Sequence, residues 1–527
     1  MSGRAALRRA WAIALTLLLV SAVCLLFSTR KQGMFIDEIY TYGLSNSSFA
    51  PFLPDALDGS IAGKVLTRGE LFDYVAVTGD EGFDFASVYY NQVNDVHPPL
   101  YYWLFNIAST FAKGSFSKWT GLVLDWLLYS LCVWVLYLLA RRLGASRFVS
   151  AATAMLYGLS LLGLSTMLMI RMYVLLALLT TLLAYWIACL MRDFRPRCCV
   201  FAALTLLAGL MTQYYFVFYA FFLCAAYVLW ALARREFKAL ACFIPCALAG
   251  ALALLLVFPA CLTHLFSGEL VSGESAVDNL KNLAQYPVRL RTFLGFVVHG
   301  FKAGLLIGAL GLAALLFVAK GVKQALREGR ARLDWLVFLI PAAVTYLLVA
   351  IISPVDEARY FYNIVPIFAL GAGFLLYLLE EAQPELSPRY RALIFLAVTL
   401  LALWEARSAP PDFLYPEHAE YNRLCAEHAD DPCVYFSDGH FEAVTEDLIQ
   451  LMAFDEFYVT GTDRDLSGML AYAGEAEEVV VFIDISEFWS SGYKAEEILA
   501  RIASETPYTH AAPLYEAGLS TTYVVSR

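Results

Sequence analysis

The sequence predicts a polytopic α-helical membrane protein with a water-soluble α/β domain at its C-terminal end. Of the 527 residues, 60% are hydrophobic and only 16% are charged, a composition that excludes an ordinary soluble enzyme. The charge is also divided unevenly. Residues 405–527 hold 6 Lys and Arg against 24 Asp and Glu, whereas residues 1–404 hold 31 against 23. We therefore expect a basic membrane domain (1–404) joined to an acidic domain (405–527).

Eleven apolar stretches are candidates for membrane-spanning helices. The first follows three arginines and lacks a small-residue cleavage site, so we expect an uncleaved helix rather than a removed signal peptide. The eleven stretches lie at about 10–28, 119–140, 148–169, 172–191, 198–213, 216–233, 239–261, 293–319, 335–352, 361–379 and 392–404.

The distribution of Lys and Arg predicts a cytoplasmic N-terminus. In that orientation each inner segment holds two to five basic residues, whereas the four short outer loops hold 1, 0, 3 and 1. Counting residues 100–112 as a span would invert this pattern, so we expect them to form a helix on the outer face, within a first outer loop of residues 29–118. An odd number of spans then makes the acidic domain extracytoplasmic. Basic residues are spread rather than clustered, which excludes a nucleic-acid interface.

The acidic domain alternates strand-like and helix-like runs. It has no Gly-rich phosphate loop and no obvious nucleophile, and its histidines, His428 among them, lack metal-ligand spacing. We expect strands at 433–436, 456–460, 478–485, 508–515 and 521–526, and helices at 441–454, 464–472 and 494–505.

Two cysteines lie in the acidic domain, at Cys425 and Cys433, and the other nine lie in or beside apolar stretches as small hydrophobes. A disulfide between Cys425 and Cys433 would fit an extracytoplasmic location. The alternative is two unrelated thiols.

Two adjacent carboxylates, Asp37 and Glu38, follow the first apolar stretch within ten residues and have apolar neighbours on both sides. Most acidic residues in loops are solvated charges. A carboxylate that is partly desolvated has a raised pKa, in a range useful to a general base, and ionisable groups at membrane depth usually mark a site. We therefore predict that Asp37 and Glu38 are catalytic.

The same loop ends in Asp95-Val-His97-Pro98-Pro99. Consecutive prolines suit the entry to a helix, which is a structural role. His97 has a second interpretation, because an imidazole can bind a phosphate oxygen or orient a carboxylate. We include Asp95 and His97 among the predicted substrate-binding residues.

Cations and tyrosines gather at the outer ends of later spans. An arginine at a membrane edge often only reaches toward lipid headgroups, and an aromatic belt also explains tyrosines. The outer loops are otherwise poor in basic residues, however, and a guanidinium pairs two phosphate oxygens at once. The predicted substrate-binding pairs are Arg171 with Tyr173, Gln213 with Tyr215, and Arg359 with Tyr360.

These motifs together resemble those of GT-C fold glycosyltransferases, in particular the bacterial branch that contains protein O-mannosyltransferases and aminoarabinose transferases. The resemblance covers residues 1–404. It implies that the first-loop acid acts as a base and that basic residues at the outer face hold the donor phosphate, and it leaves metal dependence open. His97 stands where aminoarabinose transferases carry Lys before the paired prolines, which weakens a lipid A assignment.

The expected function is an inverting transfer of a sugar from a polyprenyl-phosphate donor to an acceptor at the outer face of a cell membrane. Asp37, helped by Glu38, would deprotonate the acceptor. Arg171, Arg359 and His97 would stabilise the departing phosphate. The alternative is a transporter or flippase of lipid-linked saccharide, which needs phosphate anchors but no base. Transporters usually carry internal repeats, and the sequence has no such pairing.

Overall fold

The computed structural model describes residues 3–57, 59–266, 277–385, 387–437, 441–461, 466–485 and 494–527, without the side chains of residues 3–10. The chain divides into two compact units, each assembled from distant segments. We call Met1–Thr29, Val96–Tyr101 and Leu122–Asp412 the helical unit. We call Arg30–Asp95, Tyr102–Gly121 and Phe413–Arg527 the mixed unit. This division differs from the predicted boundary after residue 404, because most of the first outer loop groups with the C-terminal segment.

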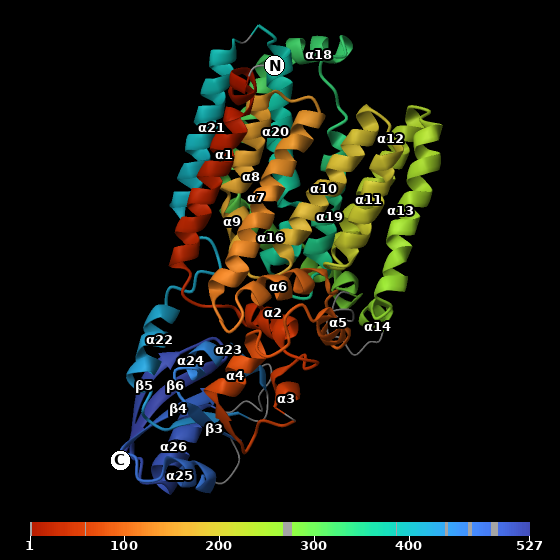
Figure 1. Cartoon of the computed structure of the whole chain (residues 1–527). Helices are drawn as coiled ribbons and strands as arrows, with labels where there is room; N and C mark the ends of the chain where they lie inside the picture. The colour runs from red at the N-terminus through yellow and green to blue at the C-terminus, as the bar shows by residue number, and fades with distance from the viewer. Residues whose placement is uncertain are drawn as a thin grey trace. The chain divides into compact units, whose positions relative to one another are not determined.

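Each of the eleven predicted apolar stretches is helical in the structure (Figure 1). Two of them are pairs of shorter helices. The helices are α1 (Gly3–Arg30), α7 (Lys118–Arg142), α8 (Arg147–Gly158) with α9 (Leu161–Leu168), α10 (Tyr173–Arg192), α11 (Pro196–Leu210), α12 (Phe216–Ala233), α13 (Phe237–Val257), α16 (Tyr286–Gly300) with α17 (Lys302–Phe317), α19 (Leu336–Ile352), α20 (Val365–Ala382) and α21 (Pro388–Ser408). Shorter connecting elements are α14 (Cys261–Phe266), η1 (Leu283–Gln285), α18 (Ala319–Arg327) and η2 (Ala358–Ile364).

The chain is a multi-pass membrane protein. Among the described residues, six helices are long and apolar enough to cross a membrane, and the number rises to eight if each of two bent pairs counts as one span. Helices α11 and α19 are apolar but shorter than this criterion requires. The predicted number of eleven spans is therefore not confirmed.

Two predicted spans are bent, by 58° between α8 and α9 and by 92° between α16 and α17. At the second bend, the fully buried Glu405 accepts the N–H groups of Lys302 at 3.1 Å and of Ala303 at 2.7 Å. A carboxylate at this position satisfies otherwise unpaired donors at the start of α17 and complements the helix dipole. Glu405 thus caps a helix, whereas the sequence suggested that it begins the soluble domain.

The mixed unit contains a six-stranded sheet in the order β1-β3-β2-β4-β6-β5. Its centre is parallel, because β2 pairs in parallel with both β3 and β4, and the remaining pairs are antiparallel. The five strands expected from the sequence are present within two residues of their predicted ends. The strands are β1 (Val65–Thr67), β2 (Cys433–Phe436), β3 (Glu456–Thr460), β4 (Glu478–Asp484), β5 (His510–Glu516) and β6 (Ser520–Ser526).

The sixth strand, β1, comes from the first outer loop. Val65 lies opposite Tyr458 of β3, and the Arg68 guanidinium donates to the Ala453 carbonyl at 2.9 Å. The first outer loop and the C-terminal segment therefore form one folded unit. The loop also supplies the helices α2 (Ile36–Asn46), α3 (Leu53–Ala56), α4 (Arg68–Val75), α5 (Phe85–Val93) and α6 (Leu100–Phe111), the last at the position of the expected outer-face helix.

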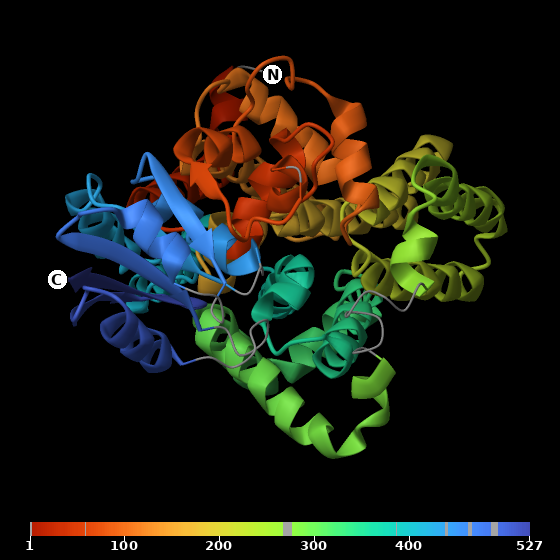
Figure 2. The ribbon, with the colours of Figure 1, turned by 90° about the horizontal axis from the view of Figure 1, so that it is seen from below.

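Helices cover both faces of the sheet (Figure 2). On one face α25 (Ser467–Ala473) and α26 (Ala495–Glu505) pack on an apolar core that includes Val434, Val481 and Ile498. On the other face Tyr435 stacks on Phe482 with ring centroids 5.6 Å apart. That second face is covered by elements that include α22 (His418–Glu427), α23 (Phe441–Glu446) and α24 (Leu448–Leu451).

Candidate functional site

Three carboxylates gather around Tyr40 in the mixed unit. Burial raises the pKa of the Tyr40 phenol well above its ordinary value, and the neighbouring charges of Tyr74, Glu442, Asp37 and Asp95 raise this pKa further. The charges of these groups therefore act on Tyr40, and Asp37 lies one helical turn before Tyr40 on α2. Asp37 and Asp95 are each half-buried. The structure thus brings together two acids predicted from the first outer loop, and it adds Glu442 from α23, which the sequence did not single out.

Buried carboxamides hold α2, which carries Asp37, in place. The Asn91 side chain donates to the Ser47 carbonyl at 3.0 Å, and the Asn106 side chain donates to the Ser45 carbonyl at 2.8 Å. These bonds satisfy carbonyl groups at the C-terminal end of α2, which have no partner within the helix. The C-terminal end of α2 is thereby fixed relative to α5 and α6.

Glu38 has a different environment from Asp37. Its carboxylate lies 2.9 Å from the Lys31 ammonium group, and neither side chain is exposed. The same carboxylate accepts the Phe35 N–H group at 2.7 Å, and Lys31 also donates to the Phe413 carbonyl at 2.6 Å. A carboxylate without exposed surface that is bound to a cation is poorly placed to take a proton from a substrate. This geometry favours a structural role for Glu38 over the predicted catalytic one.

The predicted tyrosines of the helical unit form a cluster. The ring centroids of Tyr215 and Tyr360 are 5.3 Å apart, and the Arg359 guanidinium lies 5.6 Å from the Tyr360 ring. Burial raises the pKa of Tyr215, and the nearby Tyr360 and Tyr173 hydroxyls raise this pKa further. Arg359 is also paired with Glu357. This cluster therefore contains four of the predicted substrate-binding residues, Tyr173, Tyr215, Arg359 and Tyr360.

Arg289 of α16 belongs to the same neighbourhood, because its charge acts on Tyr215. The guanidinium is buried, lies 3.1 Å from an Asp356 carboxylate oxygen and donates to the Ser353 hydroxyl at 2.8 Å. Arg289 was not among the residues predicted from the sequence. An arginine at the start of an apolar helix was the available signal.

The remaining predicted residues of the helical unit lie at turns between helices. Arg171 precedes α10 and is 3% exposed. Gln213 is buried between α11 and α12, where its side-chain oxygen accepts the Tyr215 N–H group at 3.5 Å. His97 is half-buried. Three residues after His97, the Leu100 N–H group donates to the Met211 carbonyl at 2.9 Å, which brings the His-Pro-Pro run near the turn that carries Gln213.

The predicted disulfide is not formed. Cys425 and Cys433 are both free thiols and both buried. Burial raises the pKa of Cys425 to about 12, and burial together with the neighbouring Cys425 raises the pKa of Cys433 well above its ordinary value. A thiol with so high a pKa is almost never a thiolate at neutral pH, so both are poor nucleophiles.

Comparison with solved structures shows which fold the chain has. No protein-family model matches the sequence, and no curated protein matches it. The structure is similar to ArnT from Cupriavidus metallidurans bound to undecaprenyl phosphate, with 11% identity, 98% of each chain covered and a TM-score of 0.50. The same enzyme in the apo state gives 12% identity, 97% of each chain and a TM-score of 0.50. AglB, the oligosaccharyltransferase of Archaeoglobus fulgidus in complex with an inhibitory peptide and a dolichol-phosphate, gives 10% identity, 98% of this chain, 74% of that chain and a TM-score of 0.50.

Proposed function

We propose that this chain, which has the GT-C fold of ArnT and AglB, is a glycosyltransferase that uses a polyprenyl-phosphate-linked donor. The acceptor lies at the outer face of the membrane. The similar structures support the donor class, since ArnT was solved with undecaprenyl phosphate and AglB with a dolichol-phosphate. The observation that carries the proposal is the half-buried Asp37 in the first turn of α2, beside Tyr40 and near Asp95.

Asp37 is the proposed base. As the acceptor oxygen attacks the anomeric carbon, its proton passes to the Asp37 carboxylate. The bond between the anomeric carbon and the phosphate oxygen breaks, and the polyprenyl phosphate leaves with the electron pair. This single displacement inverts the anomeric centre. A positioned general base of this kind contributes about 100-fold to 10,000-fold to the rate.

Arg171 and Arg359 are the proposed partners of the donor phosphate. A guanidinium fork can pair with two phosphate oxygens and stabilises the charge that develops on the leaving group. His97 and the side chains of Gln213 and Tyr215 would help to bind the donor headgroup. Arg359 is already paired with the half-exposed Glu357. We propose that the donor phosphate replaces Glu357 as the partner of Arg359.

The proposed topology places the N-terminus in the cytoplasm and the C-terminal segment outside the cell. Asp37 belongs to the mixed unit, so the acidic C-terminal segment supports the helix that carries the proposed base. The -18 charge balance of residues 405–527 disfavours an anionic polymer as the acceptor, because like charges repel.

The experiment compares the surface glycans and glycoproteins of cells with and without this protein by mass spectrometry, which identifies the sugar and the acceptor. Cells are then complemented with wild-type protein, Asp37→Asn or the matched control Asp80→Asn, which changes an exposed acid of the same loop. We expect wild type and the control to restore the glycan and Asp37→Asn to reduce it at least 100-fold at equal expression. Full restoration by Asp37→Asn would exclude the proposed base. Transport of the lipid-linked sugar without release of polyprenyl phosphate would indicate a flippase instead.

A further inference from the structure

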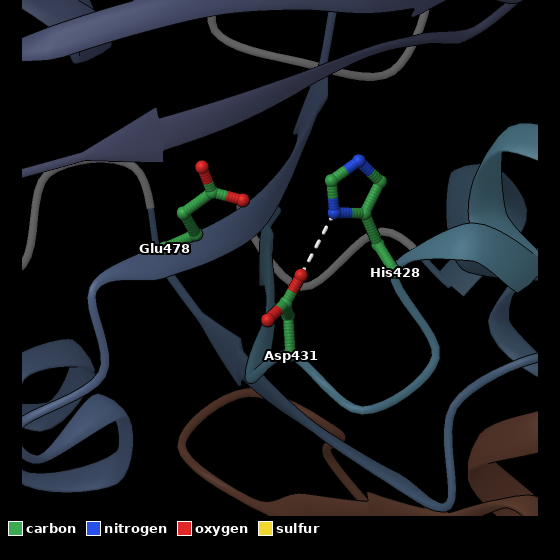
Figure 3. A group of neighbouring side chains, drawn as sticks. All are labelled: His428, Asp431 and Glu478. Carbon is green, nitrogen blue, oxygen red and sulfur yellow. Dashed lines mark hydrogen bonds and ion pairs between the residues drawn. The ribbon is translucent and has the colours of Figure 1, made fainter.

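One side-chain cluster, formed by His428, Asp431 and Glu478, lies in the C-terminal part of the mixed unit and has no part in the proposed transfer. Each residue offers one ligand atom, and the three atoms lie within 4.8 Å of one another. Figure 3 shows the three side chains directed toward a common space, with the His428 imidazole 2.8 Å from an Asp431 carboxylate oxygen. His428 and Asp431 are half-buried, and Glu478 is exposed.

The fold explains why His428 lies over the sheet. Tyr421, Cys425 and His428 follow one another at intervals of four and three residues, which places them on one side of α22. Tyr421 and Cys425 are fully buried, so this side of the helix faces the sheet. His428 ends the helix, and the Asp431 N–H group donates back to the His428 carbonyl at 3.0 Å. The resulting turn fixes the distance between His428 and Asp431.

The strand register explains the third residue. Cys433 of β2 lies opposite Val480 of the parallel strand β4, and the Val480 N–H group donates to the Pro432 carbonyl at 2.9 Å. Glu478 begins β4, two residues before Val480, and Asp431 lies in the turn before β2, two residues before Cys433. Since side chains alternate between the faces of a sheet, Glu478 lies on the same face as Val480. A carboxylate oxygen of Glu478 lies within 4.8 Å of one of Asp431.

Two carboxylates held side by side repel each other unless a cation lies between them. The surrounding segment is itself strongly acidic, so no general excess of positive charge relieves the repulsion. An imidazole nitrogen next to two carboxylates is a donor set that suits first-row transition metals better than Mg²⁺ or Ca²⁺, which prefer oxygen ligands alone. Bonds of about 2.1 Å to a tetrahedral metal place neighbouring ligand atoms about 3.4 Å apart. His428 Nδ1 and Asp431 Oδ2, now 2.8 Å apart, would need to separate only slightly to bind the same ion.

We propose that His428, Asp431 and Glu478 form a binding site for a divalent transition-metal ion, with Zn²⁺ as its expected occupant. Three protein ligands leave at least one coordination position for water. The ion would tie the end of α22 to the beginning of β4 and relieve the repulsion between the two carboxylates. Metal binding would therefore stabilise the C-terminal part of the protein, because a ligand that binds only the folded state raises its stability.

The test uses full-length protein in detergent, stripped of metal with a chelator and titrated with Zn²⁺ by equilibrium dialysis. The ligand variants are His428→Gln, Asp431→Asn and Glu478→Gln. Matched controls are Asp430→Asn and Glu477→Gln, which remove the same charge from exposed neighbours in the same segments. We expect saturable binding of one ion, at least tenfold weaker binding in each ligand variant, and affinities within twofold of wild type in both controls. Equal Zn²⁺ affinity in wild type and all ligand variants, or no saturable binding to wild type, would overturn the proposal.

Two measurements on the wild-type protein remain decisive if the ligand variants fail to fold. Chelation should lower the Tm by several degrees, and Zn²⁺ but not Ca²⁺ should restore it. Co²⁺ should give visible d–d absorption bands that titrate with one equivalent and disappear on addition of Zn²⁺. If Zn²⁺ does not change the Tm and Co²⁺ gives no d–d absorption bands, His428 and Asp431 form only an ion pair.

Discussion

Lys31 Nζ lies 2.9 Å from Glu38 Oε2, and neither side chain has exposed surface. The adjacent Asp37, in contrast, is half-buried near Tyr40 and two further carboxylates. One step along α2 therefore separates a fully buried acid in an ion pair from a half-buried acid. Mutation of Glu38 should therefore lower the stability of the protein, whereas mutation of Asp37 should leave its stability unchanged.

Glu38→Gln should lower stability while Asp37→Asn should not. Removing the charge of Glu38 leaves the Lys31 ammonium buried without its partner, and breaking a buried ion pair costs about 3 to 5 kcal/mol. Thermal unfolding of the purified variants measures the effect. Each variant keeps the size of the side chain, so the pair is its own control. A Tm for Glu38→Gln equal to that of wild type would contradict the structural role.

Arg171→Ala and Arg359→Ala should impair use of the donor more than use of the acceptor. A hydrogen bond to a charged group contributes about 1.5 to 3 kcal/mol, so each loss should reduce kcat/KM for the donor about 10-fold to 100-fold. Arg359→Lys should recover only part of this, because an ammonium group lacks the guanidinium fork. The exposed Arg291 on α16 supplies the control, as Arg291→Ala. Unchanged donor kinetics in both alanine variants would indicate that Arg171 and Arg359 contact lipid headgroups and not the donor phosphate.

The stability of the mixed unit should fall as pH rises from about 4 to about 7, and Asp447 should account for much of the change. Burial raises the pKa of Asp447 to about 7, with the charge of Glu446 adding to the rise and hydrogen bonds from Ser520, Tyr435 and Tyr421 opposing it. At a pH between the ordinary Asp pKa and about 7, Asp447 keeps its proton in the folded protein but has lost it in the unfolded chain. The folded state therefore loses relative stability as pH rises through this range, by as much as about 4 kcal/mol.

Asp447→Asn removes the titrating group but keeps the shape of the side chain. The slope of Tm against pH between 4 and 7 should become flatter in this variant, and the exposed Asp455→Asn should leave the slope as in wild type. Identical slopes in wild type and Asp447→Asn would show that other groups set the pH dependence.

Thiol labelling tests the topology. Cys425 and Cys433 are buried free thiols, so an impermeant reagent should label neither in folded protein, with or without prior reduction. An added cysteine at the exposed Ser504, as Ser504→Cys, should be labelled in intact cells if the C-terminal segment is extracytoplasmic. Labelling only after permeabilisation would place that segment in the cytoplasm.

The sequence predicted local structure better than long-range pairing. Apolar runs located helices at all eleven predicted stretches, and alternating patterns located β2 to β6, because these signals lie within short windows. The helix predicted at 441–454 is instead two short helices, α23 and α24. Strand β1 has three residues, and its partner lies in another segment, so no local pattern marks it. The Glu478 of the proposed metal site was missed for the same reason. Its relation to His428 depends on the register of two strands, whereas motif searches rely on spacing along the chain.

The second source of error was the burial of individual side chains, which the sequence does not reveal. Asp37 and Glu38 look equivalent in sequence, and only packing shows that one is half-buried and the other fully enclosed. Cys425 and Cys433 likewise have a spacing compatible with a disulfide, yet both are buried free thiols, Cys425 on α22 and Cys433 in β2. Arg289 carried a usable signal, since a charged residue at the start of an apolar helix is costly unless it has partners.

The hydrogen bond from Lys31 to the Phe413 carbonyl joins residues 382 positions apart, so it can form only late in biosynthesis. The first outer loop is made early, and its partner strand β3 is made near the end of translation. At about 5 to 20 residues per second, the loop waits roughly 20 to 80 seconds before its sheet exists. During that time Lys31, which pairs with Glu38 of α2, lacks the Phe413 carbonyl as a partner. Chains that stop early therefore carry a first outer loop whose strand β1 lacks its partner β3.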